Sequence, residues 1–408
     1  MNIINEGYAE AEYFFKKGIG PYIFDQKNDK FLDLSSAGGT SLLGHNNKIF
    51  KKSLKDFLNK NFSNFSLPNL HAKNLSTTIQ KILPQFSKII FCNSGAEANM
   101  KAIRIARAVT GKDKIINISG SWHGSIDQFL LYKNINGRII RLSSGLEKNI
   151  EKKIIYAPYN NFYETKKIIT KNKNNICCVL VEPIQGCLPS DQNINYLKLL
   201  SNYCDREKII LIFDEIITGL RTECSSVQNY YKFVSDISTF GKAFGNSLPI
   251  GFIGITKKIE EKIKRIKLKI FFGGTYSANS LSTYVANSTL NYLIKNKKKV
   301  FSVLENISNK FCYDLNNKII SKNINARVIR FKSIIRIIFS KNIPKDRLQR
   351  DFFEKNNNLK RIKFINFLKK KKIYFPSNGI IFLNTSFSSK ELDYLLKQII
   401  EGLKKCFK

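Results

Sequence analysis

One lysine stands apart from the many basic residues of this chain. In the stretch ISTFGKAFGNSLPIGFIGIT, from Ile237 to Thr256, Lys242 is the only charged residue, although the chain contains 68 Lys+Arg. Apolar surroundings disfavour a charged amine, so they lower the lysine pKa from its usual value of about 10.4. The neutral amine is a nucleophile that can form a Schiff base with a carbonyl compound. The alternative is an ordinary lysine whose amine extends into solvent.

Two carboxylates follow an apolar run in the segment IILIFDEIITGLR. Asp214 and Glu215 come directly after residues that we expect to form a central strand. A carboxylate at such a place is costly to desolvate without a partner, so it usually meets a ligand. Asp214 could hold a cationic ring nitrogen. Alternatively the pair caps a helix, and for Glu215 this structural role is an equal candidate.

A third signal is the turn FCNSGAEANM, where an expected strand is followed at once by an expected helix. Ser94, Gly95 and Ala96 would place backbone N–H groups and one hydroxyl at the helix N-terminus. Such a terminus suits a phosphate group. An ordinary strand-to-helix turn capped by a serine would look the same.

The segment SGSWHGS holds the only tryptophan of the chain, Trp122, and one of its three histidines, His123. A large aromatic side chain after a strand can stack on a flat ring. The alternative is that Trp122 belongs to the core and that His123 is a hydrogen-bonded turn residue. By itself this segment is a weak signal.

Short apolar runs alternate with helical patterns over the middle of the chain, which predicts a mostly parallel sheet covered by helices on both faces. Runs without polar alternation, such as ICCVLV, are typical of strands buried on both faces. Ligands of such sheets bind at the carboxyl ends of the strands, which is where the four signals lie. The expected strands are Lys88–Cys92, Lys114–Ile118, Ile176–Val181, Ile209–Phe213 and Gly251–Ile255.

Three zones can be separated along the sequence. Residues 1–65 include YIFDQKNDKFLDLSS, which predicts a β-hairpin, and we expect this segment to join a smaller domain. Residues 66–285 form the expected large domain. Residues 286–408 form the expected C-terminal part of the small domain, with strands in NARVIRFKSIIRIIFS and a final helix.

Composition excludes several classes of protein. The eight cysteines form no CxxC pair and there are three histidines, so neither a disulfide framework nor a metal site is indicated. No apolar run is long enough for a membrane helix and no signal peptide is evident, so we expect a cytoplasmic protein without a membrane partner. The formal charge of +37 is spread over the whole chain without a nucleic-acid-binding motif. We attribute this charge to compositional bias and expect no nucleic-acid partner.

Taken together, the signals name one cofactor. A phosphate anchor, a stacking aromatic, an acid for a ring nitrogen and an amine for an aldehyde are what pyridoxal 5'-phosphate (PLP) requires. Six segments of the chain resemble the class III (ω) PLP-dependent aminotransferases and follow one another in the same order. They are NSGAEANMKAIRIARAVTGKDKI, SWHG, VEPIQG, FDEIITGLR, GKAFGNSLPIG and GGTYSANSLS. Within that family the chain is most similar to the glutamate-1-semialdehyde 2,1-aminomutases. The resemblance covers roughly residues 20–290.

The resemblance implies PLP fold type I: a large domain with a mostly parallel seven-stranded sheet flanked by helices, plus a smaller α+β domain. It also implies roles for single residues. Lys242 would carry the cofactor and shuttle protons, and Asp214 would keep the pyridine nitrogen protonated. The phosphate would be bound by Ser94, Gly95 and Ala96.

Further residues match family positions more loosely. Trp122 would lie over the cofactor ring, and Ile217 stands where an aliphatic residue is aminomutase-like. Thr275 would reach the phosphate of a partner subunit, which implies a homodimer with active sites at the subunit interface. Two polar positions keep a structural alternative: Glu182 as a strand-end cap and Arg221 as a structural ion pair. His123 is another possible site residue.

The substrate positions depart from the aminomutase pattern. The family's Ser-Pro-Val-Arg segment, which binds the substrate carboxylate, has no counterpart, and the first arginine of the chain is Arg104. The family's glutamate in APSAFEAGF is missing from FPSNGIIFLN. We therefore expect an aminotransferase that moves an amino group from a donor to an aldehyde or ketone acceptor.

Two alternatives remain open from the sequence. The first is the aminomutase itself, which makes 5-aminolevulinate by intramolecular amino transfer. The second is a basic nucleic-acid binder that keeps the fold without catalysis, and the intact Lys242 and Asp214 argue against it.

Overall fold

The structure is a computed structural model that describes residues 14–407. Contacts between Cα atoms divide the chain into two compact units. Unit 1 comprises the residues up to Lys51, Cys187–Ser190 and the chain from Lys298 onward. Unit 2 comprises Lys52–Gly186 and Asp191–Lys297. The sequence placed the domain boundaries at residues 65 and 285, and that division into domains stays a prediction.

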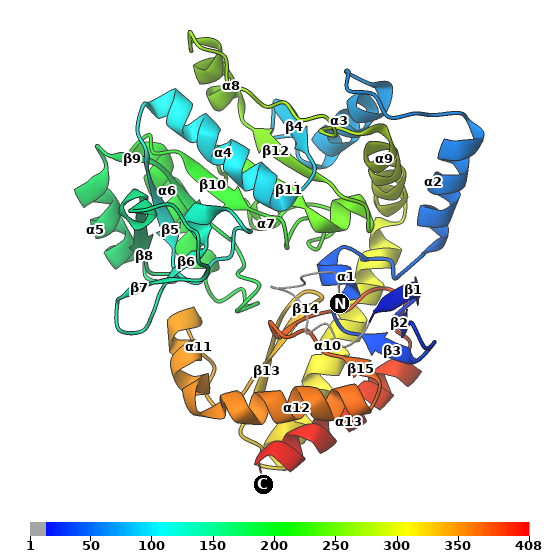
Figure 1. Cartoon of the computed structure of the whole chain (residues 1–408). Helices are drawn as coiled ribbons and strands as arrows, with labels where there is room; N and C mark the ends of the chain where they lie inside the picture. The colour runs from blue at the N-terminus through cyan, green and yellow to red at the C-terminus, as the bar shows by residue number, and fades with distance from the viewer. Residues whose placement is uncertain (1–13, 408) are drawn as a thin grey trace. The chain divides into compact units, whose positions relative to one another are not determined.

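Unit 2 is built around a seven-stranded sheet with the order β4-β12-β11-β10-β9-β5-β8 (Figure 1). The four pairings among β11, β10, β9, β5 and β8 are parallel, and β12 is antiparallel to both of its neighbours. The predicted mostly parallel sheet is therefore confirmed. The strands are β4 (Lys88–Cys92), β5 (Lys114–Ile118), β8 (Ile154–Ala157), β9 (Ile176–Val181), β10 (Leu211–Asp214), β11 (Ile237–Gly241) and β12 (Gly251–Ile255).

The burial of the strand residues explains which strands could be predicted from the sequence. Every residue of β9, β10, β11 and β12 is buried, as expected for strands covered on both faces. The sequence predicted four of the seven strands with their observed bounds, and β10 is shifted to end at Asp214. It did not predict β8, which is short, or β11, whose sequence ISTFG contains polar residues and a glycine.

Helices cover the sheet of unit 2. In Figure 1 helix α4 lies across β10, β11 and β12, and its buried face belongs to one apolar cluster with residues of the sheet. The helices are α3 (Leu70–Ile82), α4 (Gly95–Thr110), α5 (Phe162–Asn172), α6 (Ile194–Arg206), α7 (Val227–Tyr231), α8 (Lys257–Lys264) and α9 (Ser280–Lys295). A small hairpin is formed by β6 (Leu131–Lys133) and β7 (Ile139–Arg141), and α2 (Lys48–Asn59) crosses the division at Lys51.

Unit 1 contains two further sheets, of order β1-β2-β3-β15 and β13-β14-β16. The hairpin predicted in the N-terminal zone is present as β2 and β3. The strands are β1 (Phe15–Ile19), β2 (Tyr22–Asp25), β3 (Lys30–Asp33), β13 (Arg327–Phe331), β14 (Ile334–Ile338), β15 (Ile373–Tyr374) and β16 (Ile380–Phe382). The helices are α1 (Ser36–Gly39), α10 (Lys297–Ser321), α11 (Arg347–Glu354), α12 (Asn358–Lys370) and α13 (Ser389–Phe407).

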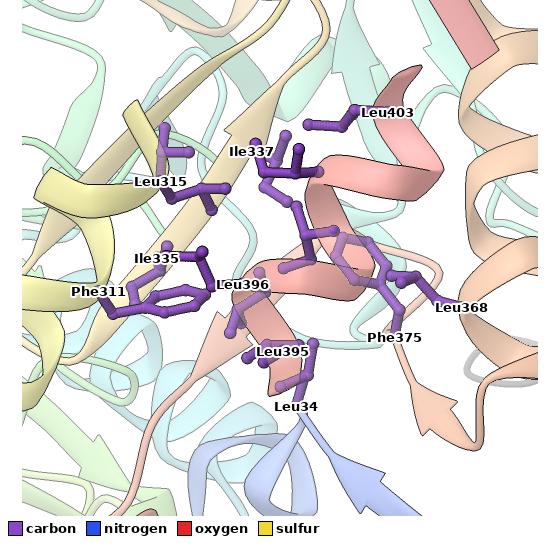
Figure 2. Packing of buried hydrophobic residues seen from close by; sticks show 14 of the residues in the cluster. Leu34, Phe311, Leu315, Ile335, Ile337, Leu368, Phe375, Leu395, Leu396 and Leu403 are labelled. Carbon is purple, nitrogen blue, oxygen red and sulfur yellow. The ribbon is translucent and has the colours of Figure 1, made fainter. Parts of the chain in front are cut away.

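Unit 1 has a hydrophobic core of its own, shown in Figure 2. Phe311 and Leu315 of α10 and Leu395 of α13 point toward Ile335 and Ile337 of β14. All five side chains are at most 3 % exposed. Burial of this kind stabilises a fold by about 25 cal/mol for each Å² of apolar surface removed from water, so unit 1 packs around its own core.

Within residues 14–407, no helix combines the length and the apolar character that crossing a bilayer requires. Over the same residues, no group of three or more His, Cys, Asp or Glu side chains is arranged to hold a metal ion.

Candidate active site

The carboxyl ends of β10 and β11 bring the two principal candidate residues to one edge of the sheet. The strands are parallel neighbours, and Asp214 is in register with Thr239. Asp214 ends β10, while Lys242 follows β11 directly and begins the short 3₁₀ helix Lys242–Gly245. Parallel strands end at the same edge, so the order of the sheet brings both residues to the position where ligands of such folds bind.

The carboxylate of Asp214 is buried and held by three hydrogen bonds. Its Oδ2 accepts from Nδ2 of Asn99 at 2.7 Å and lies 2.7 Å from Nδ1 of His123. Its Oδ1 accepts from the backbone N–H of Ile216 at 3.0 Å. Because an ionised carboxylate only accepts, Nδ1 of His123 must carry the hydrogen of that contact. The side chain of Asp214 is therefore fixed in orientation before any ligand binds.

The partners of Asp214 are themselves held in place. Oδ1 of Asn99 accepts from the hydroxyl of Thr239 at 2.7 Å, and Nε2 of His123 lies 3.2 Å from Oδ1 of Asn117. Asn99, Thr239 and Asn117 are all buried. None of these three residues was predicted from the sequence. One signal was present for Asn99, which is a polar residue on the apolar inner face of α4 among Ala98, Ala102 and Ala106.

Lys242 has an unusual environment for a lysine. Its backbone φ of 45° lies in the left-handed region, which is uncommon for a residue with a side chain. Burial lowers the pKa of its amine below the usual value, while the carboxylates of Asp214 and Glu182 act in the opposite direction. Desolvation is the largest of these effects. The neutral form of the Lys242 amine is thus more populated at a given pH than that of a solvated lysine.

Glu182 lies beyond the end of β9, in a turn that it ties together. Its Oε1 accepts from the backbone N–H of Trp122 at 2.6 Å, and its Oε2 accepts from that of Gly186 at 3.1 Å. Burial raises the pKa of this carboxyl to about 7, and the charge of Asp214 contributes to the shift. Glu182 therefore fastens the Trp122 turn, and its charge interacts with that of Asp214 and Lys242.

The turn from β4 into α4 is formed as the sequence predicted. Ser94 is the N-cap of α4, and its Oγ accepts from the backbone N–H of Glu97 at 3.1 Å. The turn packs closely against its neighbours. A Cβ at Gly95 would lie 2.6 Å from Cδ1 of Ile216, and a Cβ at Gly251 would lie 2.2 Å from the carbonyl oxygen of Ser94. Only glycines permit this approach of the turn to β12 and to the segment after Asp214.

Other predicted site residues have varied surroundings. The Trp122 side chain is 40 % exposed, so it is not a core residue. Gly124, two residues later, has φ +91° and could not carry a Cβ, which would lie 2.7 Å from Cβ of Ala96. The Ser94–Ala96 turn and the Trp122 turn are therefore in contact. Ile217 is partly buried, and Thr275 is exposed in a turn.

Two of the remaining polar residues are buried near the end of β10. Arg221 is 3 % exposed, its Nε donates to the carbonyl of Ile217 at 3.2 Å, and burial lowers the pKa of its guanidinium to about 9. Glu215 is fully buried and accepts from the backbone N–H groups of Val227 and Gln228 at 2.9 and 3.2 Å. Glu215 thus caps helix α7, which is the structural role considered for it.

Comparisons with known proteins agree with this arrangement. The model of the family "Aminotransferase class-III" matches residues 3–355. Among curated proteins, a "Glutamate-1-semialdehyde 2,1-aminomutase" of Wigglesworthia glossinidia brevipalpis is 32 % identical over 412 residues, which covers 98 % of this chain and 91 % of the relative. A protein of the same name from Methanosphaera stadtmanae is 30 % identical and covers 98 % of this chain and 94 % of the relative.

A solved structure is also similar in fold. A glutamate-1-semialdehyde-aminomutase from Pseudomonas aeruginosa PAO1 superposes with a TM-score of 0.85, with 14 % sequence identity, and covers 97 % of this chain and 88 % of that one. At this identity the superposition shows the fold alone. It confirms the α/β class and PLP fold type I, which the sequence predicted.

Proposed function

We propose a function for this chain on one premise: the chain is an enzyme that belongs to the class-III aminotransferase family. The proposed function is PLP-dependent transfer of an amino group, with glutamate-1-semialdehyde as substrate and 5-aminolevulinate as product. The observation that carries the catalytic part is the fixed carboxylate of Asp214 at the sheet edge from which Lys242 emerges. The choice of substrate rests on curated relatives that are 30–32 % identical over nearly the whole chain.

The residues present fit PLP. The N-cap turn of α4 offers backbone N–H groups to a phosphate, and the helix dipole favours negative charge there. The glycine contacts at Gly95 and Gly124 leave no room for side chains, so backbone borders this part of the site. We assign Ser94, Gly95 and Ala96 to the phosphate and Trp122 to the face of the ring. PLP supplies an aldehyde that takes up an amino group and a ring that withdraws electrons.

Asp214 holds a proton on the ring nitrogen in this proposal. A carboxylate favours the charged form of a cationic partner within hydrogen-bond reach. The bonds from His123, Asn99 and the Ile216 backbone occupy specific lone pairs of Asp214 and set its orientation. His123 and Asn99 are positioning residues, because they act on the reaction through Asp214.

Lys242 supplies the amine that carries the cofactor and then moves protons at the substrate carbons. This second role needs an amine that can both accept and donate a proton near neutral pH. Burial acts in this direction, because desolvation lowers the pKa of Lys242. Asp214 and Glu182 limit the decrease.

The experiment that tests the substrate is a donor-free assay. Protein loaded with PLP or pyridoxamine phosphate is given glutamate-1-semialdehyde as the sole substrate, and 5-aminolevulinate is measured. We expect continued turnover without an amino donor. Conversion that stops after one equivalent and resumes when L-glutamate is added, with release of 2-oxoglutarate, would instead show an external donor.

The second candidate is an aminotransferase that uses an external amino donor. One observation favours it: no arginine precedes Arg104 in the sequence, and a lysine does not provide the same two-pronged contact to a substrate carboxylate. L-Glutamate as sole substrate separates the candidates. For the aminotransferase it converts the cofactor to its amino form, with a change in the visible spectrum.

We also propose that the enzyme is a homodimer that shares its active sites. Unit 2 has a cavity of about 590 Å³ whose lining includes exposed apolar side chains. Among them are Phe65, Leu67 and Leu70, whose exposed fractions are 50, 71 and 64 %. Tyr276, next to Thr275, is 65 % exposed. Apolar exposure of this extent is typical of an interface. Light scattering coupled to gel filtration should give twice the chain mass of 46.9 kDa, and a monomer would contradict the proposal.

A further inference from the structure

A buried arginine interrupts the apolar central strand of a sheet in unit 1. Strand β14 reads Ile334-Ile335-Arg336-Ile337-Ile338, and all five residues are buried. The Arg336 side chain is 4 % exposed and lies between Ile329 of β13 and Ile380 of β16 in the ladder. Removing a guanidinium from water is costly unless charge and hydrogen bonds replace the hydration.

The charge and hydrogen bonds of Arg336 are only partly compensated. Nη1 donates to the carbonyl oxygen of Asn378 at 2.7 Å, and Nη2 lies 3.9 Å from Oε2 of Glu354. Nε is buried without a hydrogen-bond partner. Burial lowers the pKa of this guanidinium to about 9, and the positive charge of Arg350 adds to that effect. The residue thus keeps donor capacity and positive charge that the protein does not use.

The two carboxylates nearby are already engaged by other groups. Glu354 accepts from the backbone N–H of Phe339 at 3.0 Å and lies 3.4 Å from Nε of Arg350. Asp351 is paired with Nη2 of Arg350 at 2.5 Å and lies 3.4 Å from Nε of Arg347. Neither carboxylate can therefore be assigned to Arg336 alone.

Arg336 lines a cavity of about 340 Å³ within unit 1. Its charged lining residues are Arg336, Arg350, Lys355 and Arg361 against Asp351 and Glu354. The lining thus carries a net charge of two positive units. Asn357 and Asn358 add polar groups to the wall. None of these residues belongs to the candidate active site.

Contacts with the backbone hold the lining arginines in place. Arg361 donates to the carbonyl of Ser377 at 3.1 Å, and Arg350 donates to that of Cys187 at 2.8 Å. Gly379, with φ +75°, lies against the guanidinium of Arg336, because a Cβ there would be 3.2 Å from Nη1. The arginines are therefore held in position before any ligand enters.

We propose that this cavity, the Arg336 cavity, binds a small dianion that carries a phosphate monoester or two carboxylates. The guanidinium group presents planar pairs of N–H donors that match the oxygens of either group. A dianion would neutralise the net charge of the lining and accept hydrogen bonds from the guanidinium groups that line the cavity. The cavity volume is suited to a small metabolite and excludes a macromolecule.

The test is calorimetric titration of the PLP-loaded enzyme with sodium phosphate and, separately, with succinate at constant ionic strength. PLP loading matters, because it fills the cofactor's own phosphate position before the titration. We expect one saturable dianion site per chain. The ligand that binds more tightly identifies the chemistry.

Three variants locate the site. Arg336→Met keeps side-chain volume but removes the charge, and we expect affinity to fall by about tenfold or more. Lys355→Gln changes an exposed lining residue without risk to the core, and we expect a loss of roughly threefold. Arg330→Met is the matched control, because Arg330 pairs with Glu305 outside the cavity. We expect this variant to bind the dianion with the same affinity as the wild type.

Each outcome decides the proposal. Weaker binding in Arg336→Met and Lys355→Gln, with Arg330→Met unchanged, supports it. Absence of saturable binding by either dianion, or equal affinity in all variants, overturns it. If Arg336→Met does not fold, as circular dichroism would show, Lys355→Gln decides alone.

Discussion

Nδ1 of His123 and Oδ2 of Asp214 lie 2.7 Å apart in an interior where both side chains are nearly inaccessible to solvent. The two residues are 91 positions apart in the sequence. The contact joins the turn after β5 to the end of β10, so the carboxylate is held by a part of the chain that also carries Trp122. In our proposal this is the contact that orients the acid toward the ring nitrogen.

Replacement of Asp214 tests its charge. Asp214→Asn keeps the size of the side chain but cannot stabilise a cationic ring nitrogen. We expect kcat/KM for glutamate-1-semialdehyde to fall by about 100-fold or more, as for the loss of other preorganised electrostatic groups. Asp113→Asn is the control, because Asp113 is exposed and pairs with Lys153. Equal losses in both variants would show that the effect is not specific.

Replacement of His123 tests positioning. His123→Phe keeps a ring but removes the donor to Asp214 and the contact with Asn117. We expect kcat to fall by about tenfold with a much smaller change in KM, because a misoriented carboxylate affects the reaction more than substrate binding. Steady-state kinetics separate the two constants. A variant with normal kcat would remove His123 from the account.

Gly251 controls the approach of β12 to the Ser94 turn, which we propose binds the phosphate. In Gly251→Ala the new Cβ would lie 2.2 Å from the Ser94 carbonyl oxygen, so the turn must shift. We expect weaker PLP binding and a loss of roughly 1–3 kcal/mol in the free energy of unfolding. Gly111→Ala is the control. Its Cβ meets no atom within 4 Å, and its φ of +67° costs about 1 kcal/mol without touching the site. If Gly251→Ala binds PLP normally, the packing argument fails.

Glu182 makes stability depend on pH. Its pKa is raised from 4.5 to about 7 by burial and by Asp214, so between these values the folded protein binds more protons than the unfolded chain. The resulting stabilisation is complete below pH about 4.5 and is lost as the pH rises to about 7. Glu182→Gln cannot ionise. From pH about 5 to 8, wild-type stability should therefore fall relative to the variant by on the order of 2 kcal/mol.

Chemical denaturation of the cofactor-free protein across this pH range measures the effect. Glu151→Gln is the control, because Glu151 is partly exposed and its pKa is lowered by Arg141. Its difference from the wild type should be constant above pH about 4.5 and should diminish only as the pH falls below that value. Parallel pH profiles for wild type and Glu182→Gln would mean that Glu182 is not protonated as described.

Local patterns were sufficient to predict most of the sheet. Apolar runs such as that of β9 show strands buried on both faces, and the strand-end position of Asp214 followed from a run of this kind. Strand β11 was missed because buried Ser238 and Thr239 resemble a loop in the sequence. The fold supplies their hydrogen-bond partners, and those partners cannot be recognised from neighbouring residues.

The same limit applies to the site. Lys242 and Asp214 could be singled out as candidates because a charged residue among apolar ones is visible in the sequence. The network of Asn99, Thr239 and Asn117 could not, because its members come from a helix and two strands that meet only in three dimensions. The Arg336 cavity was missed for the same reason.

The central claim is that Lys242 carries the cofactor, and peptide mapping after borohydride reduction tests it most directly. Reduction of the PLP-loaded wild-type protein should fix the cofactor covalently to one peptide, the one containing Lys242. With 68 Lys+Arg in the chain, mapping is needed to separate this label from surface modification. In Lys242→Ala the label should disappear together with the visible absorbance of the bound cofactor. A stoichiometric label on another lysine, or the same label in Lys242→Ala, would contradict the account.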